Sequence, residues 1–221
     1  MPRETSEARK ARAGKIFAIL RAVYPDAHCE LNFTNPLELL VATILSAQCT
    51  DKRVNIVTQN LFKQFRSAAD FAAADLSALE AAIRTAGFYR NKAKNIQSAA
   101  RSIVKHHGGE VPRTMEELVE LGGVGRKTAN VVLGNAFATN RGIAVDTHVA
   151  RLSFRLGFTE EVDPVKIEEV LMKLMLQEQW TLASHLLIWH GRRRCAARNP
   201  DCGHCEIAAL CPRRGVKDRT P

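Results

Sequence analysis

Three of the four residues in Gly122-Gly123-Val124-Gly125 are glycine, and they separate two apolar runs at 118–121 and 131–133. Glycine permits a tight turn with positive φ, and without a Cβ it lets the backbone approach a ligand closely. The second helix would begin near Gly125, with its first N–H groups unpartnered inside the helix. We therefore predict a helix–hairpin–helix at 118–137 whose second N-terminus holds a phosphate oxygen and reads no bases.

Two residues that follow this hairpin in the sequence have side chains suited to catalysis. Lys127 follows the turn beside Arg126, near the positive end of a helix, and such an electropositive setting favours a neutral amine. A neutral lysine amine is a nucleophile that forms Schiff bases. Asp146 lies in the segment 143–148 and could steer proton transfers. A lone lysine or aspartate is usually a solvated charge, but the pair in this framework indicates a catalytic site.

Four cysteines form a compact group near the C-terminus, with the spacing C-x6-C-x2-C-x5-C: Cys195, Cys202, Cys205 and Cys211. The N-terminal segment lacks the apolar core of a signal peptide, so we expect a reducing compartment in which disulfides are disfavoured. Structural zinc sites usually pair two C-x-x-C knuckles, and only one is present. An iron–sulfur cluster takes four thiolates from a compact loop. The residues alone leave zinc and iron–sulfur open.

The net charge of +9 is unevenly spread and is concentrated in three segments, 89–107, 122–155 and 190–221. Such clustering points to a polyanionic partner, the alternative being a generally basic surface. No apolar run approaches the ~18 residues of a membrane span. Apolar residues recur at helical spacing and no alternating strand pattern appears, so we predict an all-α fold. In one such helix, predicted at 51–65, we expect Asp51 to be the N-cap.

Taken together, the segments 121–132 and 145–149 resemble the helix–hairpin–helix–Gly/Pro/Asp DNA glycosylases, most of all the endonuclease III family. The resemblance covers about 31–211, and it departs from the family where Gly122 replaces the usual proline. It implies two helical lobes with a DNA cleft between them. One would be a six-helix barrel at 29–140, and the other an iron–sulfur cluster domain that combines 1–28 with 141–221.

The cysteine spacing matches the iron–sulfur loop of that family, which implies a [4Fe–4S] cluster on the four cysteines. The segment 45–51 resembles a loop from which Gln48 would fill the gap left by a flipped nucleotide. The segment 87–93 resembles a second wedge loop, with Phe88 where the family often has leucine. The structural alternatives are a helix C-cap for Gln48 and a core aromatic for Phe88.

The resemblance implies a bifunctional DNA glycosylase and AP lyase that acts on double-stranded DNA with damaged pyrimidines or abasic sites. Lys127 would displace the base from the sugar with help from Asp146, and β-elimination would then cut the strand. We expect an intracellular monomer associated with the nucleoid. The alternatives are a monofunctional mismatch or adenine glycosylase, and a non-catalytic DNA-binding metal protein. The other expected DNA-binding residues are Gly123, Gly125, Arg126, Thr128, His148, Arg151, Arg193 and Arg194.

Overall fold

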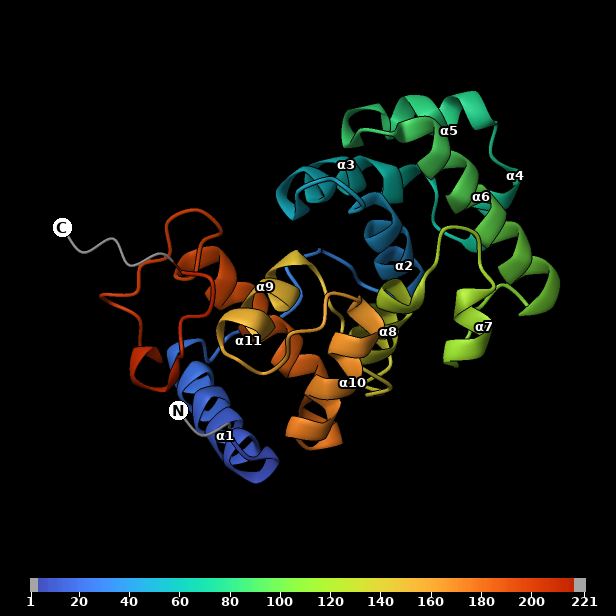
Figure 1. Ribbon diagram of the computed structural model, residues 1–221. Helices are drawn as coiled ribbons and strands as arrows, with labels where there is room; N and C mark the ends of the chain where they lie inside the picture. Colours follow the sequence, from blue (N-terminus) through green and yellow to red (C-terminus); the bar gives the residue numbers. More distant parts are fainter. Residues whose placement is uncertain (1–3, 217–221) are drawn as a thin grey trace. The chain divides into compact units, whose positions relative to one another are not determined.

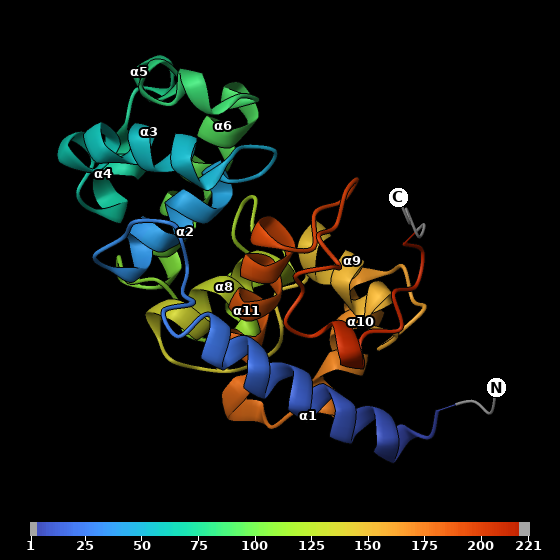
Figure 2. The ribbon, with the colours of Figure 1, turned by 90° about the vertical axis from the view of Figure 1, so that its left-hand side faces the viewer.

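The computed structural model describes residues 4–216, and every regular element among them is a helix. The expected all-α class is therefore confirmed. The chain divides into two compact units, one formed by 29–139 and the other by 1–28 together with 140–221. Figures 1 and 2 show the helices of both units from two directions. None of the described helices is long and apolar enough to cross a membrane.

The unit 29–139 is built around the strongly apolar helix α2. The conformation of Pro36 suits the first turn of α2, and the Asn35 side chain caps its N-terminus. Helix α8 packs against α2, and α6 runs beside α4 and α5 (Figure 1). The helices of this unit are α2 (Pro36–Leu45), α3 (Asp51–Gln64), α4 (Ala68–Ala73), α5 (Leu76–Ala82), the 3-10 turn η1 (Arg84–Ala86), α6 (Tyr89–His106), α7 (Met115–Val119) and α8 (Arg126–Ala136).

One detail of the sequence interpretation is wrong. Thr50, and not Asp51, is the N-cap of α3: its hydroxyl accepts a hydrogen bond from the backbone N–H of Arg53 at 3.3 Å. Asp51 is the first residue of the helix, where a carboxylate still interacts favourably with the helix dipole. Both residue types cap helices well, so the sequence pattern alone does not separate them.

The second unit has its own apolar core, to which Leu20, Leu152, Phe158 and Leu187 belong. Helices α9 and α11 pack against each other, and α1 lies against α10 and α11 (Figure 2). The cysteine-rich segment follows α11 directly. The elements are α1 (Ser6–Val23), α9 (Thr147–Arg155), α10 (Pro164–Leu174), α11 (Trp180–Arg193) and the 3-10 turns η2 (Gln177–Gln179) and η3 (Ala208–Leu210).

Candidate functional site

The glycine hairpin lies between α7 and α8 and forms the predicted turn. Gly123 adopts a left-handed conformation with φ +76°, which an L side chain rarely adopts. Gly125 is the N-cap of α8 in an extended conformation, and no side chain that the structure describes accepts a hydrogen bond from the first turn of that helix. The N–H groups at the start of α8 are therefore not capped by a side chain, and together with the helix dipole they can bind an anion.

The hairpin packs closely on α6, which explains why glycine stands at position 122. A Cβ on Gly122 would lie 2.8 Å from the Cβ of Ser98, and one on Gly123 would lie 2.7 Å from the Cβ of Asn95. Side-chain carbons do not approach each other so closely. Glycine at 122 is thus required by contact with α6, whatever it does to the flexibility of the unfolded chain.

Lys127 is the second residue of α8, and its side chain is exposed. Within the described residues, its amine has no hydrogen-bond or ion-pair partner. The amine is therefore free to reach a ligand, and it is not locked in the apolar core. Arg126 is exposed beside it, and Thr128 is half-buried.

Asp146 is the N-cap of α9. Its Oδ1 accepts hydrogen bonds from the backbone N–H groups of His148 and Val149, each at 2.8 Å. The carboxylate is half-buried, and its Oδ2 has no hydrogen-bond partner among the described residues. The cap fixes the side chain while one oxygen stays available. Asp146 belongs to the second unit and Lys127 to the first.

Arg151, which we expected to contact DNA, directs its guanidinium into the protein. Its Nη2 donates to the carbonyl of Gly191 at 2.9 Å and to that of Cys195 at 3.1 Å. Burial lowers the pKa of this side chain, and the neighbouring Arg155 adds to the effect. The same Nη2 lies 3.1 Å from Nδ1 of His148. Arg151 and His148 thus hold α9 to the end of α11 and to Cys195.

Gln48 and Phe88 share an unusual backbone conformation. Gln48 has φ +53° and Phe88 has φ +47°, and both side chains are exposed, Phe88 to 66%. Exposure rules out the core-aromatic interpretation of Phe88. The C-cap of α2 is Ser46, so Gln48 does not cap that helix. A left-handed backbone at residues other than glycine is strained, and such strain is concentrated at functional sites.

Lys92 is a buried polar residue that the sequence analysis missed. Its side chain is 3% exposed, and its Nζ donates to the carbonyls of Leu45 and Ala86, each at 2.8 Å. Burial lowers its pKa. A signal was present in the sequence, because Lys92 lies on the same helical face as Ile96 and Ile103, which are buried.

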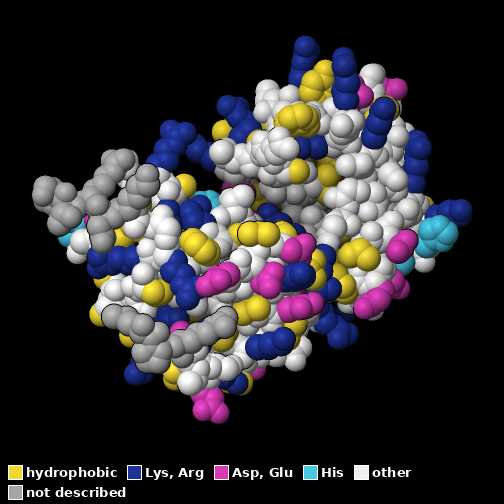
Figure 3. Space-filling model, in the orientation of Figure 1, with side chains coloured by type: hydrophobic (Ala, Val, Ile, Leu, Met, Phe, Trp, Pro, Cys, Tyr) yellow, Lys and Arg dark blue, Asp and Glu magenta, His cyan; other side chains and the backbone are white. Residues whose placement is uncertain are grey.

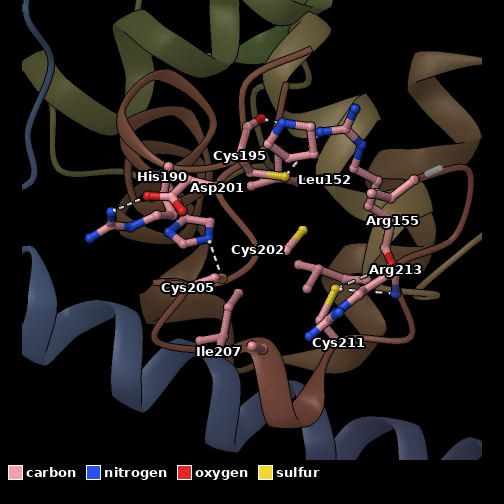
Figure 4. A pocket seen from close by; sticks show the side chains of 15 residues that line it. Leu152, Arg155, His190, Cys195, Asp201, Cys202, Cys205, Ile207, Cys211 and Arg213 are labelled. Atoms are coloured by element: carbon pink, nitrogen blue, oxygen red, sulfur yellow. Dashed lines mark hydrogen bonds and ion pairs between the residues drawn. The ribbon is translucent and has the colours of Figure 1, made fainter. Parts of the chain in front are cut away.

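The four cysteines of the C-terminal segment point into one cavity of the second unit (Figure 4). All four side chains are half-buried, and none forms a disulfide with another described cysteine. Burial raises the pKa of the Cys205 and Cys211 thiols. Within residues 4–216, no three His, Cys, Asp or Glu side chains converge closely enough to hold a single metal ion. The cysteine sulfurs therefore surround a space and do not meet at a point.

Nitrogen atoms approach three of these sulfurs. Nη1 of Arg155 lies 3.2 Å from Sγ of Cys195, and the backbone N–H of Arg213 lies 3.4 Å from Sγ of Cys211. Nε2 of His190 is 3.5 Å from Sγ of Cys205. The Arg155 guanidinium and the Arg213 N–H donate to sulfur, whereas the Cys211 thiol itself donates to the carbonyl of Arg155 at 3.6 Å. Arg155 is 8% exposed, and the sequence analysis did not single it out.

Arg193 and Arg194, both expected at the DNA, differ in environment. Arg194 donates to Asp201 at 2.8 Å and to Glu206 at 2.7 Å, and these bonds raise its pKa. Arg193 is exposed, with its guanidinium 3.9 Å from the centre of the Trp189 ring. Stacking holds Arg193 in place without neutralising it. Figure 3 shows Lys and Arg side chains projecting from both units, with Asp and Glu side chains among them.

The comparisons with known proteins agree with this geometry. Residues 41–177 match the profile of the HhH-GPD superfamily base excision DNA repair proteins. The chain is 55% identical to endonuclease III of Synechocystis sp. over 205 residues, covering 93% of this chain and 94% of the relative. It is 42% identical to endonuclease III of Escherichia coli K12 over 202 residues, covering 91% and 95%.

Two solved structures are similar throughout. One is a non-covalent endonuclease III–DNA complex and the other a trapped endonuclease III–DNA covalent intermediate. Each superposes with a TM-score of 0.88 at 46% identity and covers 92% of this chain, and the alignments include 95% and 96% of those chains. The hairpin, the fold and these similarities together show that the chain belongs to the HhH-GPD superfamily of base excision DNA repair proteins.

Proposed function

We propose that Lys127 and Asp146 carry the chemistry of this protein, which is a bifunctional DNA glycosylase and AP lyase of base excision repair. The observation that carries the proposal is the exposed amine of Lys127, which has no partner among residues 4–216 and lies directly behind a helix N-terminus that none of their side chains caps. An amine in this place can reach a sugar whose phosphate the hairpin holds. A similar protein has been trapped as a covalent DNA intermediate, which supports a nucleophilic residue on the protein.

The proposed reaction has two stages. Nζ of Lys127 attacks C1′ of the extruded sugar, the bond from C1′ to the base breaks, and the base leaves. The ring then opens to a Schiff base between Lys127 and C1′. The Schiff base acidifies the C2′ proton, and loss of that proton expels the 3′ phosphate by β-elimination. Asp146, whose Oδ2 has no hydrogen-bond partner in the described part of the chain, accepts and returns protons during these steps.

The proposed substrate is double-stranded DNA that contains an oxidised pyrimidine or an abasic site, bound by a monomer inside the cell. The start of α8, with Gly123, Gly125, Arg126 and Thr128, holds a backbone phosphate. Arg193 adds a charge that Trp189 positions. Gln48 and Phe88 occupy the space from which the nucleotide leaves. Arg151, His148 and Arg194 support these contacts from within the protein.

The residues of the cavity fit a [4Fe–4S] cluster bound by Cys195, Cys202, Cys205 and Cys211. Zinc would draw four sulfurs to within about 2.3 Å of one point, whereas these side chains surround a space. A cluster needs such a space and four thiolates. When bound, the cluster supplies a rigid anchor for the segment 195–211. Arg193, which is exposed, lies next to that segment, and Arg194 is ion-paired to Asp201 and Glu206 within it.

Borohydride trapping tests the nucleophile. Reduction of the Schiff base on an abasic duplex should link the wild-type protein covalently to DNA, and Lys127→Gln should abolish the linked species. Lys63→Gln, which alters an exposed lysine of α3, is the matched control and should trap normally. An adduct of wild-type yield from a folded Lys127→Gln protein would assign the nucleophile to another residue.

A monofunctional glycosylase is the second candidate function. It would activate water through Asp146 and would not need an amine at position 127. Under that mechanism, Lys127→Gln would still release the base, and heat or alkali would be needed to cut the strand. Measuring base release and strand cleavage separately on one labelled duplex distinguishes the two mechanisms.

A further inference from the structure

Lys92 connects two turns that are far apart in the sequence. Its Nζ is buried in the unit 29–139 and donates one hydrogen bond to the carbonyl of Leu45 and one to the carbonyl of Ala86, each at 2.8 Å. Leu45 ends α2, and Ala86 ends η1. Carbonyls at helix ends lack partners within their own helix, so a single ammonium group satisfies two such acceptors at once.

Each of these carbonyls lies shortly before an exposed residue with a strained, left-handed backbone. Gln48 lies three positions after Leu45, and Phe88 lies two positions after Ala86. Both residues have a left-handed backbone. A residue other than glycine stays in this region only where its surroundings hold it there, because the conformation costs on the order of 1 kcal/mol. Lys92 donates a hydrogen bond to each of the two turns.

A buried lysine is a costly way to join two helices. The charged amine loses its hydration, and an apolar side chain of similar length would fill the same space without that cost. Lys92 cannot be a second nucleophile, since its amine is enclosed and engaged by two carbonyls. What the amine provides, and an apolar side chain would not, is a fixed geometry between the two turns.

We propose that Lys92 is a positioning residue that fixes the turn carrying Gln48 relative to the turn carrying Phe88, so that both side chains enter the DNA as one rigid pair. This inference rests on the proposed function, in which these two side chains fill the space left by the extruded nucleotide. Both turns are anchored to one atom, so neither can shift without breaking a buried hydrogen bond. The two turns are therefore already ordered in the free protein, so less conformational entropy is lost when the side chains insert into DNA.

A mutant cycle on duplex DNA tests the proposal. The variants are Lys92→Met, the pair Gln48→Ala with Phe88→Ala, and the combination of all three. Single-turnover base release is measured on a duplex with one oxidised pyrimidine, and extrusion is followed by the fluorescence of a 2-aminopurine placed beside the lesion. Lys63→Met, on the exposed surface of α3, is the control and should behave as wild type.

In the wild-type background, Lys92→Met should slow base release and extrusion about tenfold. In the background that lacks both inserted side chains, it should cause no further loss, since residues that act through one another are not additive. An unchanged rate would overturn the proposal. So would an equal loss in both backgrounds, because that result would show only general destabilisation.

Two further measurements keep the result interpretable. Should Lys92→Met be unfolded at the assay temperature, Lys92→Arg keeps donors for two carbonyls. It should give a smaller loss of rate with the same non-additivity, and equal losses in both backgrounds would again contradict the proposal.

Borohydride trapping on a single-stranded abasic oligonucleotide does not require a base stack to be opened. Lys92→Met should keep that adduct, whereas failure of the Lys127 assignment would appear as an adduct in Lys127→Gln with Lys92 intact.

Discussion

Oδ1 of Asp146 accepts a hydrogen bond from the backbone N–H of His148 at 2.8 Å, so the proposed catalytic carboxylate is also a helix cap. Asn caps helices about as well as Asp, which allows the two roles to be separated. Asp146→Asn should change the free energy of unfolding by less than about 1 kcal/mol. It should lower single-turnover base release by about a hundredfold or more, since the general acid–base group is lost.

Thermal unfolding and base release are measured on the same preparations of Asp146→Asn. Asp146→Ala, which loses the cap as well, should be less stable by about 1 kcal/mol than Asp146→Asn and no more active. If Asp146→Asn were fully active, the carboxylate would be a cap only.

Gly125→Ser should raise the stability of the protein and weaken its binding to DNA. Gly125 is the N-cap of α8 and offers no side-chain acceptor to the first turn. A serine hydroxyl would accept a hydrogen bond from one of those N–H groups and stabilise the protein by a few tenths of a kcal/mol. The same N–H group would then be lost to a DNA phosphate.

We therefore expect weaker binding of Gly125→Ser to both damaged and undamaged duplexes, measured by fluorescence anisotropy at fixed salt concentration. A cap added at another helix provides no such effect and serves as the control: Gln179→Ser, at the start of α11, should leave DNA affinity unchanged. Unaltered DNA affinity in Gly125→Ser would show that the start of α8 does not bind a DNA phosphate.

Gly122 and Gly14 should respond to alanine in opposite directions. A Cβ at Gly122 meets Ser98 at 2.8 Å, whereas a Cβ at Gly14, in α1, meets no atom of the described residues within 4 Å. Gly122→Ala should destabilise the protein by about 1–3 kcal/mol through overpacking. Gly14→Ala should stabilise it by up to about 1 kcal/mol, because alanine is the better helix former.

Denaturant unfolding measures both changes. Adding Ser98→Gly should reduce the loss caused by Gly122→Ala, since it removes the carbon that the new Cβ contacts. If the two effects were simply additive, the contact between the hairpin and α6 would not be the reason for glycine at position 122.

The sequence predicts the features that depend on local chemistry. The helical periodicity gives the all-α class, and the glycines give the turn at Gly123. The assignment of Asp51 as a helix cap was wrong because the neighbouring Thr50 suits that place equally well. Two polar residues, Lys92 and Arg155, were missed for another reason. Most of their partners are main-chain atoms of other segments, and those encounters exist only in the folded chain.

Arg155 holds the start of the cysteine-rich segment through several hydrogen bonds. Its Nη1 donates to Sγ of Cys195 at 3.2 Å and to the carbonyl of Ala196 at 2.8 Å, while its Nη2 donates to the carbonyl of Ala197 at 2.7 Å. Arg155→Met keeps much of the side-chain volume and removes all of these donors. Breaking a largely buried network of this kind should cost about 2–4 kcal/mol, and Cys195 should lose its fixed position.

We expect Arg155→Met to contain less iron per chain as purified, and to lose its visible absorption faster than the wild type when exposed to a chelator. Arg198→Met, at an exposed arginine of the same segment, is the control and should retain both properties. Base release should fall only in proportion to the iron lost, because Arg155 contributes through the anchoring of 195–211 and not at the DNA. Wild-type iron content and wild-type stability in Arg155→Met would show that the segment is held by the cysteines alone.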